Sequence, residues 1–163
     1  MPSTFLASAR TRIVVTTQVK TAVVVTLASA ALGISCLPLH ATPREPTRSV
    51  WDGVYTEEQA TRGEPLYLKL CAKCHGSDLM GGITAPPLMG REFRASWDNA
   101  TMGTLFDRTL ESMPQDNPET LTRQETADLT AFILREGDFP AGPTELPTQS
   151  EALNEIIYRS STP

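Results

Sequence analysis

Two cysteines and a histidine stand within five consecutive residues, Cys71-Ala72-Lys73-Cys74-His75, and this cluster limits what the chain can fold into more than any other feature. The other cysteine and histidine, Cys36 and His40, lie near the N-terminus. Three crowded Cys and His groups do not supply the four ligands of a structural zinc site. A thioredoxin-like redox pair would require a βαβ context, which the sequence does not show. A disulfide across the short loop would leave His75 unexplained.

The C-x-x-C-H spacing is the attachment pattern of c-type haem. Two thiols can add across the vinyl groups on adjacent edges of the porphyrin. The histidine directly after the second cysteine then lies beneath the iron and can donate an imidazole nitrogen. The motif therefore predicts one covalent haem c with its iron, attached through Cys71 and Cys74 and ligated by His75. The haem would also supply much of the core that so short a chain lacks.

The N-terminal region has the pattern of an export signal. Residues 1–41 contain three basic residues and no acid, and an uncharged run rich in Ala, Val and Leu covers residues 21–37. Small residues follow, which favours cleavage after Ala41 and a periplasmic or otherwise secreted protein. Two alternatives stay open. The 17 uncharged residues are at the short limit for an uncleaved membrane anchor, and residues 32–36 loosely resemble a lipoprotein cleavage site ending at Cys36.

The charge of the chain restricts its partners. Without residues 1–41, 11 basic and 19 acidic residues remain, which gives a formal net charge of −8. Two haem propionates would make it more negative. Phosphate binding needs a basic face, so nucleic acid is not expected as a partner. Membrane contact is expected only if the leader is retained or lipidated.

The predicted helices surround the cysteine motif. Residues 56–59 have the capping-box spacing that opens a helix, which would lead into Cys71. Pro65 removes a backbone donor and clashes with the preceding turn, so we expect a kink there or a new start at Pro65. Residues 76–92 are rich in Gly and Pro and are predicted to be a loop.

Two further helices are predicted in the second half of the chain. A short one covers about residues 102–111, and the loop 113–118 follows it. A second capping box at 122–125 opens another helix, which Gly137 and Pro140 end. No strand pattern is strong enough to build a sheet.

These patterns together predict a small all-α domain over residues 56–147. Residues 42–55 before it are predicted to be a linker, in which Trp51 and Tyr55 could fold back on the domain. Residues 148–163 are predicted to be an extended C-terminal tail with one weak helical stretch near 150–154.

A second axial ligand for the iron must come from outside the motif, and thioether sulfur is a known option. Met80 is too close to His75 to reach the opposite haem face easily. Met89 lies in an apolar run that favours packing, and Met102 opens a predicted helix. Core filling is the competing role for any of these methionines.

Met113 is the remaining candidate and the one that the sequence favours. It lies 38 residues after His75, on a loop between two predicted helices. Pro114 pushes Met113 toward an extended backbone, which can aim its side chain inward.

Several stretches between Val50 and Leu146 form a pattern that resembles the class I c-type cytochromes. The resemblance is strongest to the single-haem type found beside, or fused to, quinoprotein and other periplasmic dehydrogenases. The stretches are Trp51-Asp52-Gly53-Val54-Tyr55-Thr56, Cys71 to Gly76, Ala85-Pro86-Pro87-Leu88, Phe93 with Trp97, Leu105-Phe106, Met113-Pro114, Ala131-Phe132-Ile133-Leu134 and Phe139-Pro140-Ala141-Gly142.

The resemblance implies a small all-α fold wrapped around one haem with one haem edge exposed. It implies His75 and Met113 as the axial ligands. Pro86 matches the family proline whose carbonyl accepts the proton of the histidine ring and so fixes the imidazole. Trp97 is similar to an aromatic residue near the propionates, for which core packing is the competing role.

The resemblance also implies a contact between the first and last helices, with Gly63 and Tyr67 facing Phe132. Pro65 departs from the helical residue usual at its position, which leaves the geometry of that contact open.

A His/Met iron has no open position for a substrate, and the thioether favours ferrous iron. We therefore expect an electron carrier and not an enzyme, with a periplasmic dehydrogenase as donor and an oxidase or another cytochrome as acceptor. A dedicated cytochrome subunit of a dehydrogenase complex is the alternative. A peroxidase would need an open iron position or a second haem, and a gas sensor would need to release Met113.

Overall fold

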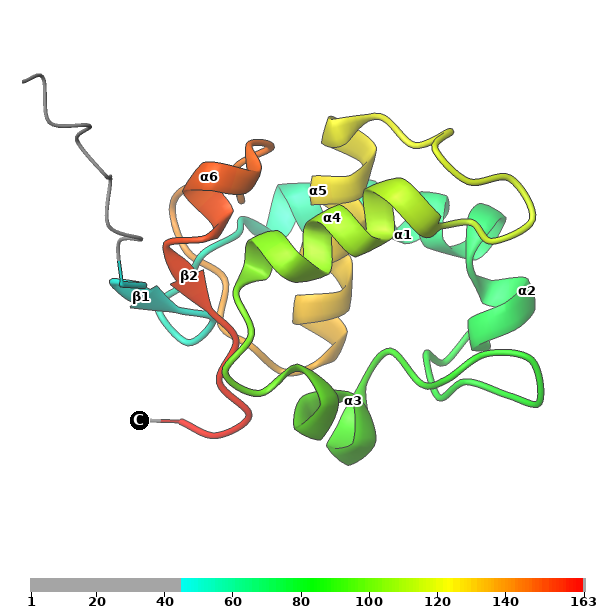
Figure 1. Cartoon of the computed structure of the whole chain (residues 1–163), viewed down its shortest axis with the longest axis horizontal. Coiled ribbons are helices and arrows are strands. Elements are labelled where there is room, and N and C mark those ends of the chain that lie inside the picture. The colour runs from blue at the N-terminus through cyan, green and yellow to red at the C-terminus, as the bar shows by residue number, and fades with distance from the viewer. Residues whose placement is uncertain (1–44, 163) are drawn as a thin grey trace, which may run out of the picture. The chain divides into compact units, whose positions relative to one another are not determined.

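The structure is a computed structural model that describes residues 45–162, so the predicted export signal lies outside the described residues. The described part is mainly helical, which confirms the predicted all-α class (Figure 1). Within it, every helix falls short of the length and apolarity that a bilayer crossing requires. The elements are β1 (Arg48–Ser49), α1 (Glu57–Leu70), α2 (Ala72–His75), α3 (Gly90–Trp97), α4 (Met102–Ser112), α5 (Arg123–Glu136), α6 (Ser150–Leu153) and β2 (Ile156–Ile157).

Helix α1 begins where the first capping pattern predicts it. The Thr56 hydroxyl accepts a hydrogen bond from the Gln59 N–H at 3.2 Å, which pairs one of the free amides of the first turn. The helix then continues without a break through Pro65, so the expected new start does not occur. Pro65 lies on the exposed side, where water can pair with the carbonyl group that the proline leaves without a donor.

Helices α1 and α5 cross at very short distance, because Gly63 has no side chain. A Cβ atom at Gly63 would lie 2.0 Å from the Asp128 carbonyl oxygen of α5. One turn further along, the rings of Tyr67 and Phe132 pack with centroids 5.2 Å apart. The contact that the resemblance implies is therefore present, and Pro65 does not disturb it.

The other predicted helices are also present. Thr122 and Glu125 form both halves of a capping box at the start of α5, with the Thr122 N–H 2.8 Å from Glu125 Oε2 and the Glu125 N–H 3.2 Å from Thr122 Oγ1. Helix α4 covers the predicted range and ends directly before Met113. The loop predicted for 76–92 is shorter than expected, since α3 begins at Gly90.

The structure differs from the sequence prediction at both ends of the domain. Residues 42–55 and 148–163 were expected to be a linker and a tail, but β1 pairs in parallel with β2 and joins the two segments. The weak helical stretch near 150–154 is present as α6. Apolar side chains from both segments enter the same core. The removal of this apolar surface from water is the physical reason why the two segments pack against the domain. The buried residues of these flanks are Val50, Val54, Tyr55, Leu153, Ile156 and Tyr158.

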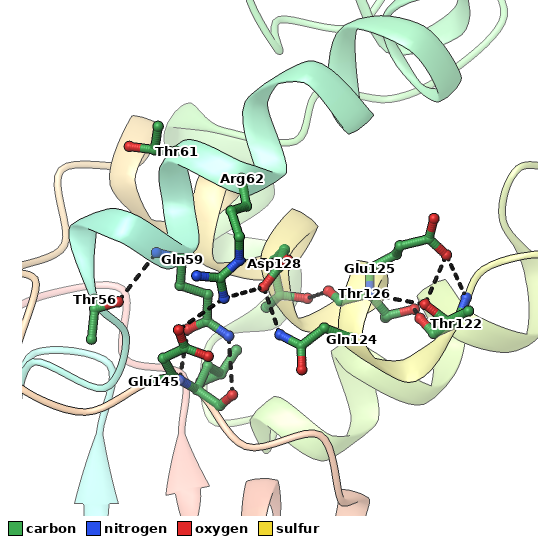
Figure 2. A network of polar contacts seen from close by, with 12 residues as sticks. Thr56, Gln59, Thr61, Arg62, Thr122, Gln124, Glu125, Thr126, Asp128 and Glu145 are labelled. Atoms are coloured by element: carbon green, nitrogen blue, oxygen red, sulfur yellow. Dashed lines mark hydrogen bonds and ion pairs between the residues drawn. The ribbon is translucent and has the colours of Figure 1, made fainter.

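A polar network fastens the chain after α5 to the crossing helices (Figure 2). Arg62 of α1 holds the buried Asp128 carboxylate through two hydrogen bonds of 3.1 and 3.0 Å, and it also pairs with Glu145 at 2.9 Å. The Gln59 amide forms two hydrogen bonds with the backbone of Leu146, of 3.1 and 2.7 Å. Every buried polar side chain of the described residues has a partner, so this core carries no unpaired group.

Candidate functional site

The cysteine motif lies on one tight helical turn directly after α1. Cys71 ends α1, and its N–H donates to the Tyr67 carbonyl at 2.9 Å. The N–H groups of Cys74 and His75 both donate to the Cys71 carbonyl, at 3.1 and 3.0 Å. This turn is α2, and both thiols are free and partly exposed.

His75 is buried, with 8% of its surface exposed. Its Nδ1 lies 2.8 Å from the Pro86 carbonyl oxygen. A carbonyl can only accept, so Nδ1 carries the proton and the lone pair of Nε2 stays available for a metal. The structure thus places Pro86 where the sequence resemblance implies it.

The loop that carries Pro86 is fixed against the motif. The Gly81 N–H donates to the His75 carbonyl at 2.8 Å, and the Leu88 N–H donates to the Leu79 carbonyl at 2.8 Å. Gly81 has φ +76°, and a Cβ there would lie 2.6 Å from the Pro87 nitrogen. Only glycine fits that backbone without strain, and it lets the loop fold closely enough to bring Pro86 to the histidine ring.

A cavity of about 710 Å³ opens beside His75, and helices α2, α3, α4 and α5 all contribute residues to its walls. Cys71, Cys74 and His75 are among the residues that line it. Apolar side chains such as Leu105 and Ile133 line the interior.

Met113 lines the same cavity from a different part of the chain. It follows α4 with an extended backbone (φ −119°, ψ 147°), as the following proline predicts, and its N–H donates to the Thr109 carbonyl at 3.0 Å. The three other methionines of the described chain do not line this cavity. Met80 is 56% exposed, Met102 is fully buried in the core, and Met89 lines a separate surface pocket.

Residues 58–133 match the family model described as cytochrome c oxidase, cbb3-type, subunit III. Residues 58–133 therefore form a cytochrome c domain, consistent with the class I type that the sequence resemblance implies. The match begins in α1, includes the cysteine motif and Met113, and ends within α5.

The cytochrome chain is also similar to a solved structure, the crystal structure of the sulfane dehydrogenase SoxCD from Paracoccus pantotrophus. The identity is 23% and the TM-score 0.45, over 66% of this chain. The matched part spans about 61% of the length of that relative. A search of curated proteins finds no match.

A cytochrome c domain binds covalent haem with iron, and the residues around the cavity fit that group. The cavity's volume of about 710 Å³ lies within the range of about 300–1,000 Å³ that is usual for cofactor sites. Burial, together with the nearby Cys74, raises the pKa of the Cys71 thiol to about 11. A protonated thiol and a thioether are both uncharged, so the half-buried position suits attachment to an apolar ring.

Helix α3 supplies the aromatic wall of the cytochrome cavity. Phe93 and Trp97 both line it, with ring centroids 6.1 Å apart. The sequence resemblance singled out Trp97, and the structure places it in the wall. The helix itself was missed, because Gly90 at its first residue and the prolines before it are typical of a loop.

An ion pair that no sequence pattern indicates joins the two segments that carry the candidate ligands. Lys73, between the two cysteines, pairs with Asp116, three residues after Met113. Both side chains are more than half exposed, so the pair adds little to stability. Its position nevertheless connects the cysteine motif to the methionine loop at the rim of the cavity.

Proposed function

We propose that the protein is a periplasmic one-electron carrier, with haem attached through Cys71 and Cys74 and iron held between His75 and Met113. The observation that carries the proposal is that His75 and Met113 come from separate segments and line one cavity. When bound, the haem supplies a one-electron redox couple. If His75 and Met113 both held the iron, no position would be left for a substrate, which favours electron transfer over catalysis.

The chain's own residues would prepare this site before any redox change. The Pro86 carbonyl holds the Nδ1 proton of His75 and fixes the ring, so that Nε2 is presented as a neutral ligand. The extended backbone at Met113 presents a thioether, which favours ferrous iron. We propose that Trp97 shields the propionate side of the cavity. Little rearrangement is needed when the charge of such a site changes by one.

Replacement of Met113 by alanine tests the ligand assignment. In the haem-loaded protein we expect Met113→Ala to keep its covalent haem, because both cysteines remain. The weak near-infrared absorption of ferric iron bound to a thioether should vanish. Met80→Ala is the matched control, since Met80 is exposed and outside the cavity. Survival of the band in Met113→Ala, with loss in the Met80, Met89 or Met102 variant, would show that another methionine binds the iron.

Carbon monoxide separates a carrier from a gas sensor or a peroxidase. The ferrous protein should bind carbon monoxide poorly, and Met113→Ala should bind it readily, because only the variant has an open position. Ready binding by the unaltered protein would contradict the proposed carrier.

We propose a periplasmic dehydrogenase as electron donor and an oxidase or another cytochrome as acceptor. An uncharged loop beside the cavity, residues 79–89, supports brief contact with redox proteins. Within this loop the Ile83 side chain is fully exposed, and Met80 is 56% exposed. Complexes of electron carriers are small and short-lived. The alternative, a dedicated dehydrogenase subunit, predicts that haem-stained protein in native extracts migrates with a larger complex, whereas a carrier migrates at its own size.

A further inference from the structure

Helix α3 forms part of the cavity wall through Phe93 and Trp97, but it has little support from other helices. Within residues 45–162, the extensive helix contacts join α1 with α5, α1 with α2, and α4 with both α5 and α6, and none of them involves α3. Other parts of the chain must therefore hold α3 in place.

The C-terminal segment 156–160, here called the strap, grips the chain immediately after α3. The Tyr158 N–H donates to the Ala100 carbonyl at 2.8 Å, and the Asn99 N–H donates to the Tyr158 carbonyl at 2.9 Å. This pair of hydrogen bonds fixes the backbone through which α3 connects to α4.

The Tyr158 side chain adds a second contact, directly onto α3. It is 1% exposed, and its ring meets Phe93 of α3 edge-on at 6.0 Å and Phe139 at 5.3 Å. Edge-to-face packing at these distances is favourable beyond the burial of area. Tyr158 thus lies between the cavity wall and the chain after α5.

Arg94 of α3 also contacts this aromatic cluster. Its Nη2 donates to the Gly137 carbonyl at 2.5 Å, and its guanidinium carbon lies 5.1 Å from the Phe139 ring centroid. Phe139 therefore supports α3 twice, once through Tyr158 and once through Arg94.

The strap has its own anchor in the N-terminal flank. The Val50 N–H donates to the Ile157 carbonyl at 3.1 Å, and Trp51 Nε1 donates to the Arg159 carbonyl at 3.0 Å. The family match covers only residues 58–133, so the strap and its anchor both lie outside it.

We propose that the strap positions α3 against the haem cavity, with Tyr158 as the positioning residue that keeps Phe93 and Trp97 in the wall. If the strap is loosened, α3 moves more freely and water reaches the cavity. A wetter haem environment favours the more highly charged ferric state, so the midpoint potential falls. The proposal rests on the proposed haem site. It does not depend on whether Met113 binds the iron or on which redox protein exchanges the electron.

The test uses the haem-loaded full chain with Tyr158→Ala and, as matched control, Tyr158→Phe, which keeps the ring. In Tyr158→Ala we expect amide hydrogen exchange in α3 to become at least about tenfold faster, while α1 and α5 stay as protected as before. The midpoint potential should fall. In Tyr158→Phe both readouts should stay at the values of the unaltered protein. Equal acceleration in α1, α5 and α3 would overturn the proposal, because Tyr158 would then be an ordinary core residue.

A second variant covers the case in which Tyr158→Ala does not fold. The Asp98 carboxylate accepts a hydrogen bond of 2.8 Å from the Ser160 N–H at the surface, so Asp98→Ala weakens the strap without opening the core. The control is Glu151→Ala, which removes one exposed acid outside the strap. Asp98→Ala should speed exchange in α3 and lower the potential, and Glu151→Ala should do neither. Unchanged exchange and potential in Asp98→Ala would refute the positioning role of the strap.

Discussion

Replacement of Gly63 by alanine should destabilise the domain, because the α1–α5 crossing leaves no room for a methyl group. The added Cβ would lie 2.0 Å from the Asp128 carbonyl oxygen and 2.9 Å from Phe132 Cβ. Ordinary contact begins at 3.4 Å, so the helices would have to separate by about 1.4 Å. Overpacking of this kind costs about 3 kcal/mol, and the better helix propensity of alanine returns about 1 kcal/mol. We expect a net loss of about 2 kcal/mol in the free energy of unfolding.

Guanidinium unfolding of the haem-loaded protein, followed by helical circular dichroism, measures this loss as a lower midpoint at unchanged slope. Gly82→Ala is the matched control, since a Cβ there would meet only the Cys74 carbonyl at 3.7 Å. It should leave the midpoint unchanged or raise it slightly, because alanine restricts the unfolded chain. A Gly63→Ala protein as stable as the control would show that the crossing can open at no cost, and the close-packing argument would fail.

Three further outcomes are expected. Thr122→Ala removes the capping box of α5 and should lower the free energy of unfolding by about 1 kcal/mol, measured as a lower melting temperature with an unchanged haem spectrum. Burial is the main cause that raises the pKa of Tyr55, Tyr67 and Tyr158 to about 12 each, from an ordinary value of 10.0. The folded state therefore binds these protons more tightly than the unfolded state does. The contribution of the three protonated phenols to the free energy of unfolding is fully present below pH 10 and is lost as the pH rises toward 12. An ultraviolet titration should show tyrosinate only as helical structure disappears, and tyrosinate in the intact fold near pH 10 would contradict this. Because acidic residues outnumber basic ones beyond residue 41, electron transfer to a basic redox protein should slow as salt rises, with screening over about 10 Å at 0.1 M. Stopped-flow rates that ignore salt would mean that the apolar loop alone governs docking.

The features that the sequence predicted well depend on residues that are close neighbours in the chain. The cysteine motif fixes its own turn, and the N-cap at Thr56 and the capping box at Thr122 bring together groups only three residues apart. The predicted box at Thr56 is half formed, because the Gln59 side chain bonds to Leu146 instead. The extended backbone at Met113 follows from the next residue alone. Such interactions are short-range, so they can be predicted from neighbouring residues in the sequence. The ligand role of Met113 stays a prediction, although its place in the cavity matches that role.

What the sequence could not predict depends on residues far apart in the chain. The two strands that join the flanks have two residues each, too few for any periodic pattern, and 106 residues separate the end of β1 from the start of β2. Tyr158 stands in a tail of mixed polarity, and nothing around it marks it as a core residue. Its burial depends on Phe93 and Phe139, which reach it only after α3 and α5 have taken their places. The cavity itself can be formed by the family-matched segment, whereas the stiffness of its α3 wall depends on the flanks. Relatives that keep the cysteine motif but lack these flanks should therefore need another support for the same helix, or tolerate a wetter haem.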